Sequence, residues 1–196
     1  MTDTRTLQRH EPAAGAATPG WALGVSAGIQ ATGSRHVVYV PDNPLSHVLR
    51  TIAARYPDIA TILATREEEA FGIAAGLYLG GGRPTVLLQS SGLGNSLNAL
   101  STLLVAYQIP VLAIISMRGD AAEWNWAQVP MGRLVRPALD ALGIQHVAIE
   151  HHDHAEEAEA AVVAVGTLAF GARVPAACLL PRRVTMPVAA TREARG

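Results

Sequence analysis

A glycine-containing segment between two apolar stretches is the first place where the sequence suggests chemistry. The range from Gln89 to Asn95 reads Q-S-S-G-L-G-N, follows an apolar run and opens a helical pattern. Free backbone N–H groups at the start of a helix can face a ligand. The segment is not the Gly-x-Gly-x-x-Gly pattern of dinucleotide-binding proteins, and no acidic residue follows at the spacing of a ribose contact. The pattern is therefore equally compatible with two interpretations: a tight turn that packs beside another backbone or a ligand, and a turn that binds a phosphate group.

Three successive glutamates, Glu67, Glu68 and Glu69, form the second candidate, at the junction between an apolar run and a helical pattern. Carboxylates in the first turn of a helix stabilise it through the helix dipole. That interpretation accounts for Glu68 and Glu69. Glu67 comes first after the predicted strand, where a side chain points into the crevice at the strand ends, so we consider it for chemistry.

Asp42 and Asn43 follow another predicted strand. At a strand end they are candidates for contacting a substrate or relaying protons. A turn-forming role is equally compatible with these residue types, because Asp and Asn side chains bond readily to nearby backbone.

A long irregular connection contains Trp124, Trp126 and Gln128. Tryptophan is favoured at interfaces, so the connection is a candidate lid or subunit contact. Gln128, with Arg118 and Arg133, is a candidate for binding an anionic substrate tail, although a surface location is the simpler interpretation of the arginines.

The histidines are a less favoured source of chemistry. His151, His152 and His154 surround Asp153 ahead of a predicted helix. A solvated loop is favoured over a metal site, because nothing in the sequence fixes the outer-shell geometry that metal ligands need. His47 is interpreted as a surface residue rather than a general acid. We therefore predict no metal site on this chain.

The elements that must position these residues alternate regularly. Strands are predicted over residues 37–40, 60–64, 85–89, 111–116, 144–149 and 176–180, and helices over 21–31, 44–56, 67–79, 95–107, 131–142 and 155–170. Apolar strands separated by helices indicate a parallel sheet covered on both faces. Right-handed crossovers then give a three-layer α/β/α domain with a doubly wound, six-stranded parallel sheet. Ligands of such sheets bind beyond the carboxyl ends of the strands. The alanines and glycines of the 67–79 helix are expected to allow close packing.

We expect this domain to span residues 21–186. Residues 1–20 are rich in Ala, Thr, Pro and Gly and are predicted to be a disordered lead, and residues 187–196 a tail. No basic head followed by an apolar stretch is present, so we expect a cytoplasmic protein. The uncharged run from Pro84 to Met117 is long enough for a membrane span, but its polar residues and glycines favour buried strands and a helix.

Composition excludes several kinds of chemistry. The chain has 196 residues, of which 49% are hydrophobic, and its formal net charge is −1, which does not suggest a nucleic-acid binder. All 15 basic residues are arginines, and the absence of lysine excludes a Schiff-base mechanism and a Walker-type phosphate-binding loop. The single cysteine, Cys178, excludes an internal disulfide and lies in an apolar run, where we expect a buried thiol.

Taken together, the two motifs resemble the pyrimidine-binding domain of thiamine diphosphate enzymes. The acidic residue Glu67 stands nine positions before Gly76, and the S-G-L-G-N segment from Ser91 to Asn95 follows the next strand. Val40-Pro41-Asp42 is also similar to the family, although Asn43 stands where a serine is common. The resemblance covers about residues 20–185 and is strongest to sulfopyruvate and phosphonopyruvate decarboxylases.

The resemblance implies roles for these residues. In the family a glutamate hydrogen-bonds N1′ of the aminopyrimidine ring, and this favours the tautomer that deprotonates the thiazolium carbon of the cofactor. An apolar setting that raises the pKa of such a glutamate is useful, because it must share a proton with a ring nitrogen. We expect Glu67 to have this role. The backbone of Ser91, Gly92, Leu93, Gly94 and Asn95 would then approach the flat ring, and Asp42, Asn43 and Gln128 would contact the substrate.

The family's magnesium and diphosphate site is missing. Related enzymes hold the metal and diphosphate on a separate domain with a Gly-Asp-Gly motif and a downstream asparagine. Here Arg118-Gly119-Asp120 is followed by Ala121, and no suitable asparagine follows. The resemblance therefore implies half an active site, with Mg²⁺ ligands on a beta subunit that is an obligate partner in a hetero-oligomer.

The resulting prediction is the alpha subunit of a thiamine diphosphate-dependent decarboxylase. Its expected substrate is 3-sulfopyruvate or 3-phosphonopyruvate, converted to the aldehyde and CO₂. Three alternatives remain open at this point: a subunit of a carboligating enzyme, a non-catalytic structural or regulatory subunit, and, less favoured, a generic nucleotide-binding α/β protein.

Overall fold

Six parallel strands form a single sheet in the computed structural model, which describes residues 17–121 and 123–186. The strands are β1 (His36–Tyr39), β2 (Ala60–Leu63), β3 (Pro84–Gln89), β4 (Leu112–Ser116), β5 (Gln145–Ala148) and β6 (Ala176–Leu180), in the order β2-β1-β3-β4-β6-β5. Burial follows this order: the central strands β4 and β6 are buried along their whole length, whereas the edge strand β2 is largely exposed. The sequence shows the same gradient, because the central strands are continuously apolar.

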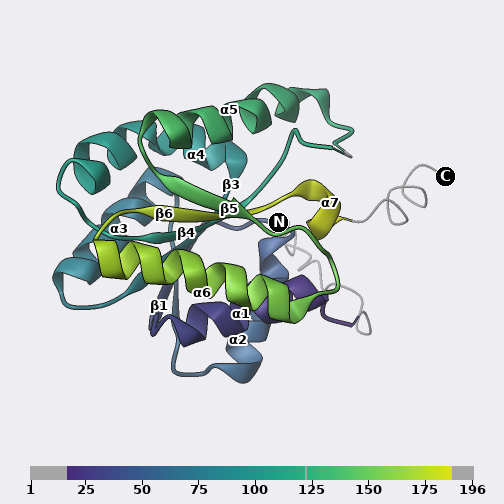
Figure 1. The fold of residues 1–196 in the computed structure, drawn as a ribbon, viewed down its shortest axis with the longest axis horizontal. Coiled ribbons are helices and arrows are strands. Elements are labelled where there is room, and N and C mark those ends of the chain that lie inside the picture. The colour runs from purple at the N-terminus through teal and green to yellow at the C-terminus, as the bar shows by residue number, and fades with distance from the viewer. Residues whose placement is uncertain (1–16, 122, 187–196) are drawn as a thin grey trace, which may run out of the picture.

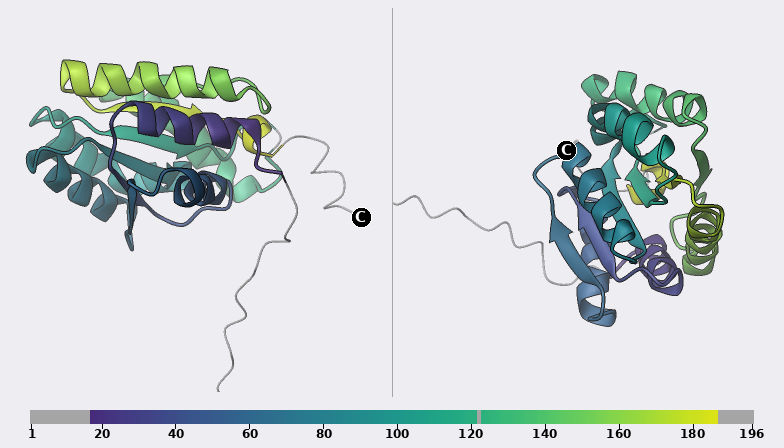
Figure 2. Two further views of the ribbon diagram at one scale, coloured as in Figure 1. Left: turned by 90° about the horizontal axis from the view of Figure 1, so that it is seen from below. Right: turned by 90° about the vertical axis from the view of Figure 1, so that its left-hand side faces the viewer.

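Helices cover both faces of the sheet (Figure 1). The longer elements are α1 (Gly20–Ala31), α2 (Leu45–Arg55), α3 (Glu67–Leu79), α4 (Ser90–Ala99), α5 (Val129–Ala141) and α6 (Ala155–Ala172), and the shorter ones are the π-helix η1 (Leu100–Val105), the 3₁₀ helix η2 (Trp126–Gln128) and α7 (Arg182–Thr185). Figure 2 shows the three layers from two further directions. The predicted three-layer α/β fold with a six-stranded parallel sheet is confirmed.

Two hydrophobic cores lie on the two sides of the sheet. One contains Trp21, Ile29 and Val162 from α1 and α6 together with residues of α2, and the other contains Phe71 and Leu93 from α3 and α4 together with residues of α5. Alternate residues of β1, β3, β4 and β6 belong to opposite cores, as the two-residue period of a strand requires. The helices that follow β2, β3 and β4 therefore share one face, and those that follow β1 and β5 share the other.

Glycines allow α1 and α6 to pack closely. A Cβ atom on Gly24 would lie 2.0 Å from the carbonyl oxygen of Ala155, and one on Gly28 would lie 2.6 Å from Cβ of Val162. The expectation that glycines in 67–79 also allow close packing is wrong, because a Cβ atom on Gly72 or Gly76 would meet no atom within 4 Å.

The predicted turn over residues 89–95 and the helix start at residue 95 are wrong. Helix α4 begins at Ser90, directly after β3, and both Gly92 and Gly94 lie within it. Glycine usually weakens a helix interior, which favours a turn in the sequence. Here each glycine admits a neighbouring side chain, Glu67 at Gly92 and Met131 at Gly94. The short helix α7 was also not predicted.

Cys178 lies fully buried in β6, and burial raises the pKa of its thiol to about 12, as expected for an unreactive core thiol.

Across residues 17–121 and 123–186, the structure contains no helix with the length and apolarity that a membrane crossing requires. The predicted tail over 187–196 and most of the predicted lead over 1–20 lie outside the described residues; Gly20 already belongs to α1.

The α1–α6 contact gives a first prediction. Gly24→Ala should lower the free energy of unfolding by about 1–3 kcal/mol, because the added methyl group overlaps the backbone of Ala155. Gly171→Ala is the matched control in α6, where a Cβ meets no atom within 4 Å, and should leave stability unchanged or slightly raised. Urea denaturation of both variants measures the difference, and equal stabilities would contradict the close packing.

Candidate active site

The site predicted from the sequence lies where the direction of winding reverses. β1 pairs with β2 on one side and with β3 on the other, so the chain leaves β1 toward one edge and continues from β3 toward the other. The connections that follow these strands diverge and leave a crevice at their carboxyl ends. In Figure 1 the strands end on the side where α7 lies.

A hydrogen-bonded group of polar side chains lies at this crevice. Asp42 accepts hydrogen bonds through both carboxylate oxygens, from Nε2 of Gln89 at 3.0 Å and from the hydroxyl of Ser116 at 2.7 Å. The hydroxyl of Ser91 donates to Oε1 of Gln89 at 2.7 Å. The ends of β1, β3 and β4 are thereby joined through side chains, which fixes the orientation of Asp42.

Glu67 lies against the start of α4. A Cβ atom on Gly92 would lie 2.2 Å from Cγ of Glu67 and 2.4 Å from its Oε1, so the half-buried carboxyl side chain occupies the space left by that glycine. Among the residues that the structure describes, Glu67 has no hydrogen-bond or ion-pair partner. The structure therefore brings together the two motifs that the sequence suggested, and leaves this carboxyl group available to a ligand.

The other two glutamates of the run have local partners. Glu69 accepts hydrogen bonds from the hydroxyl and the backbone N–H of Thr65, which lower the pKa of its carboxyl group. Glu68 forms an ion pair with Arg66 at 2.7 Å. Both interactions lie at the N-terminus of α3, in agreement with the helix-stabilising interpretation of these two residues.

The remaining residues of the predicted cofactor segment separate along α4. Leu93 is buried in the core beneath α3 and α4, Gly94 faces Met131 of α5, and Asn95 is exposed. Ser91 and Gly92 are therefore the members that lie with Glu67 and Gln89.

A buried ion cluster that the sequence did not suggest lies beside the crevice. The side chain of Glu123 is 2% exposed and accepts hydrogen bonds from Nε of Arg118 at 2.7 Å and from Nη2 of Arg118 at 3.2 Å. Nε of Arg182, in α7, lies 3.7 Å from the same carboxylate, and its side chain is 4% exposed. Burial by itself would raise the pKa of Glu123, but hydrogen bonds from Arg118 and from the backbone N–H groups of Asn125 and Gly119 outweigh it and lower the pKa to about 2.

A cavity of about 360 Å³ is lined by residues of the Asp42 group and by the two arginines of the ion cluster, but not by Glu67. Asp42, Asn43, Gln89, Arg118 and Arg182 line it, together with Pro41, Pro44, Trp124 and Met186. Two of the predicted substrate-contacting residues, Asp42 and Asn43, are therefore at the cavity. Gln128 is the last residue of η2 and does not belong to the lining, and Arg133 is exposed on α5.

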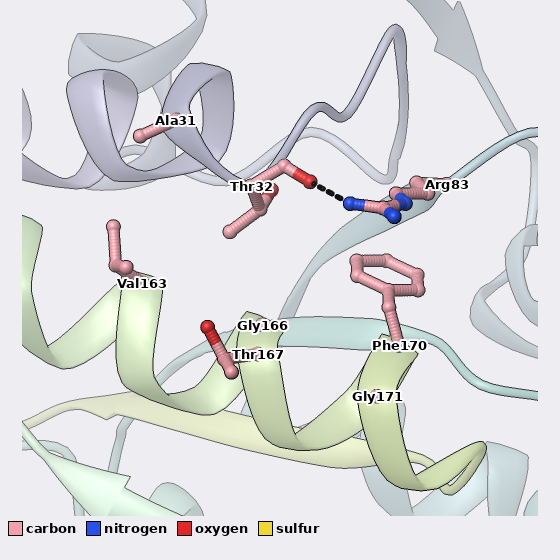
Figure 3. Close-up of a pocket in the computed structure, with 8 residues that line it drawn as sticks. All are labelled: Ala31, Thr32, Arg83, Val163, Gly166, Thr167, Phe170 and Gly171. Carbon is pink, nitrogen blue, oxygen red and sulfur yellow. Dashed lines mark hydrogen bonds between the residues drawn. The ribbon is translucent and has the colours of Figure 1, made fainter.

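A second cavity lies at the other end of the sheet (Figure 3). It measures about 230 Å³ and lies between the last turns of α1 and α6, where Arg83 donates to the carbonyl of Thr32 at 3.1 Å and stacks over the ring of Phe170. Thr32, Arg83 and Phe170 precede β1, β3 and β6, so this cavity faces the amino ends of the strands. It contains none of the predicted site residues.

The histidine segment forms a small exposed cluster. Nδ1 of His151 and Nδ1 of His154 lie 2.5 Å and 3.5 Å from Oε2 of Glu157, and the three ligand-type atoms lie within 4.8 Å of one another. Glu157 also accepts a hydrogen bond from the backbone N–H of Glu150 at 3.1 Å. These contacts hold the start of α6, and the prediction that the chain carries no metal site remains a prediction.

The sheet order, the crevice at its switch point and a glutamate set against a helix glycine define an α/β domain of the kind that binds ligands at its carboxyl edge. A family model described as "Thiamine pyrophosphate enzyme, N-terminal TPP binding domain" matches residues 24–128. The chain belongs to this family. The matched range includes Glu67, Gly92 and Asp42, and ends before α7.

Relatives of known name support the same membership. Sulfopyruvate decarboxylase subunit alpha of Methanocaldococcus jannaschii is 50% identical over 105 residues, which cover 54% of this chain and 62% of the relative. The subunit of that name from Methanothermobacter thermautotrophicus is 44% identical over 120 residues, covering 61% and 72%. Phosphonopyruvate decarboxylase of Streptomyces viridochromogenes is 32% identical over 159 residues, covering 81% of this chain and 39% of the relative. The match to the first of these relatives thus spans about three fifths of its length.

A solved structure shares the fold. The 2-oxoglutarate:ferredoxin oxidoreductase from Magnetococcus marinus superposes with a TM-score of 0.65 over 84% of this chain and 29% of its own. Its sequence identity is 13%, so this likeness concerns the fold alone.

The ion cluster gives a prediction with a defined pH dependence. Glu123→Gln should lower the free energy of unfolding at pH 7 by roughly 3 kcal/mol, because the half-buried Arg118 and the buried Arg182 lose their shared carboxylate. The pKa of Glu123 lies below its usual 4.5 in the folded chain, so its contribution is present above about pH 4.5 and is lost as the pH falls toward 2. The stability difference between wild type and variant should shrink over that range in urea titrations.

Glu156→Gln is the matched control for this experiment, because Glu156 is exposed in the first turn of α6. Its loss should cost at most about 1 kcal/mol. A deficit in Glu123→Gln that stays constant from pH 7 to pH 2 would contradict the assignment.

Proposed function

We propose that this chain is the alpha subunit of a thiamine diphosphate-dependent 2-oxo acid decarboxylase and supplies the glutamate that activates the cofactor. The observation that carries the proposal is the position of Glu67: a half-buried carboxyl group on the space left by Gly92, without a partner among the described residues. The other glutamates of the run are engaged in local contacts at the start of α3. The likeness to subunits named sulfopyruvate decarboxylase alpha supports the activity.

The described residues are compatible with the aminopyrimidine half of thiamine diphosphate. An aminopyrimidine is a flat ring with nitrogen acceptors and a donor, and it needs a carboxyl group at one edge and backbone that can approach its face. Glu67 meets the first requirement. Gly92 supports this position, because the absence of a side chain leaves the space in which the carboxyl side chain of Glu67 lies against the start of α4.

The proposed chemistry divides between the chain and the cofactor. When bound, thiamine diphosphate supplies the nucleophilic carbon and the electron sink for loss of CO₂. Glu67 holds a proton between its carboxyl group and the ring nitrogen N1′, and thereby acts as the acid–base group that activates the cofactor. Asp42, fixed by Gln89 and Ser116, is positioned to exchange a proton with substrate or product at the crevice.

The names of the relatives support a substrate class. We propose a three-carbon 2-oxo acid with a sulfonate or phosphonate tail, converted to the aldehyde and CO₂. Similarity to proteins named sulfopyruvate decarboxylase and phosphonopyruvate decarboxylase supports this class.

The proposal includes a partner. The chain has no Gly-Asp-Gly motif, and Arg118-Gly119-Asp120 is instead part of the loop held by Glu123. We infer that Mg²⁺ and the diphosphate are held by a beta subunit that covers the carboxyl edge of the sheet. The name "subunit alpha" of the relatives supports a two-subunit enzyme.

The space at Gly92 gives a test that separates position from chemistry. Gly92→Ala places a methyl group on the Glu67 side chain, which is flexible enough to move, so the free energy of unfolding should change by less than about 1 kcal/mol. Displacement of the carboxyl group should lower kcat about a hundredfold in the assembled enzyme. Gly171→Ala, remote from the crevice, should retain the wild-type kcat. Wild-type turnover in Gly92→Ala would argue against the proposed position of the ring.

Glu67→Gln tests the carboxyl group itself. Glutamine has the same shape but cannot share a proton with a ring nitrogen, so CO₂ release from sulfopyruvate should fall by about 10²–10⁴-fold. Size-exclusion chromatography should show an intact complex with the partner. Unchanged turnover in this variant would leave only a structural or regulatory role for the chain.

A further inference from the structure

The loop after β4 presents a fixed guanidinium group to the cavity. Arg118 follows β4 by two residues, and its backbone N–H donates to the buried hydroxyl of Ser90 at 3.1 Å. Its Nε and Nη2 both donate to Glu123, so one edge of the planar fork is held by a carboxylate that is 2% exposed. Nη1 has no hydrogen bond to the described residues, and Arg118 lines the cavity. Glu123 therefore fixes the orientation of the guanidinium group, and Nη1 is left to bond to a ligand in the cavity.

A second guanidinium group lies in the same wall. Arg182 also lines the cavity, and its Nε lies 3.7 Å from the Glu123 carboxylate. Five donors from the loop and from Arg118 reach the two oxygens of Glu123, so this carboxylate is fixed in place rather than able to turn into the cavity. The wall formed by the β4 loop and α7 thus has two positive groups held by one buried anion.

The same cavity also has a negatively charged lining residue. Asp42, at the end of β1, faces the same cavity, and both of its oxygens are already hydrogen-bonded. An anion in the cavity is repelled by Asp42 and attracted by Arg118 and Arg182. Such an arrangement orients a ligand as well as binding it.

The cavity and the proposed catalytic carboxyl group both lie beside the junction of β3 and α4, although Glu67 itself does not line the cavity. Gln89 lines the cavity and ends β3, whereas Gly92, three residues later, contacts Glu67. A volume of about 360 Å³ exceeds what a three-carbon acid needs, and lies at the lower end of the range for small-molecule sites.

We propose that Arg118 and Arg182 bind the anionic tail of the substrate, so that this cavity selects sulfonate- or phosphonate-bearing 2-oxo acids over tail-less ones. The proposal rests on the proposed function for the identity of the substrate. A sulfonate or phosphonate group presents three acceptor oxygens. The planar set of N–H donors on arginine can bond to two of them at once, which a cation that acts as a single point charge does not do. Arg118 is the specificity-determining residue, and Arg182 supplies the second positive charge.

Binding of a tail mimic to the full chain tests the proposal without cofactor or partner. Methanesulfonate and methylphosphonate are titrated by calorimetry against wild type, with dimethyl sulfone as the uncharged analogue of the same shape. Both anions should bind and the sulfone should not. Arg118→Gln should weaken anion binding by about tenfold or more, whereas Arg133→Gln, an identical change on the exposed face of α5, should not. No anion binding by wild type, or equal affinity in Arg118→Gln, would overturn the proposal.

Asn43→Asp keeps the test decisive if Arg118→Gln does not fold. It adds a negative charge to the cavity lining without touching the ion cluster, and should weaken anion binding to a similar extent. Unchanged affinity in a folded Asn43→Asp chain would place the anion elsewhere and overturn the proposal.

The assembled enzyme separates this proposal from the proposed function. Arg118→Gln should raise KM for sulfopyruvate at least about tenfold and reduce the preference for sulfopyruvate over pyruvate, whereas Glu67→Gln lowers kcat for both. Anion binding in a chain that shows no decarboxylation would contradict the proposed function alone. Decarboxylation with a wild-type KM in Arg118→Gln would contradict the tail site alone.

Discussion

The reversal of winding at β1 determines where every candidate functional group lies. The chain passes from β1 to β2 across one face of the sheet and from β2 to β3 across the other, so the connections after β1 and β3 separate at the carboxyl edge. Asp42 ends up on one side of the gap and Gln89 on the other, near enough to hydrogen-bond. A parallel sheet with a single winding direction would leave no such gap, because helices would cover it.

Two glutamates near this edge illustrate how environment assigns different roles to the same side chain. Glu123 receives five hydrogen bonds and lies near a second arginine, so it is held as an anion and shapes a loop. Glu67 has no partner among the described residues and borders a glycine. The first arrangement stabilises structure, and the second leaves a carboxyl group that a ligand can engage.

The sequence predicted most of the fold because its strands are apolar and its helices are periodic. The helix over 67–79 and the strand over 176–180 have the predicted bounds. Residues 89–95 were interpreted as a turn because glycine is uncommon within helices, and only the tertiary contacts of Gly92 and Gly94 show why α4 includes them. Glu123 and Arg182 were missed for a similar reason: charged residues in loops and chain ends are usually exposed, and nothing local indicates that they meet. The sequence suggests Arg118 as an anion-binding candidate, but it does not indicate that Glu123 orients this side chain or that Arg182 lines the same cavity.

In the proposed function, the Glu67 carboxyl group activates the cofactor through a ring nitrogen. Deuterium exchange at the thiazolium C2–H of thiamine diphosphate, followed by proton NMR after acid quench of the assembled enzyme, measures that activation before any substrate is bound. We predict that exchange in wild type exceeds exchange in Glu67→Gln by about a hundredfold or more. Equal exchange rates in two complexes that both hold the cofactor would contradict the claim.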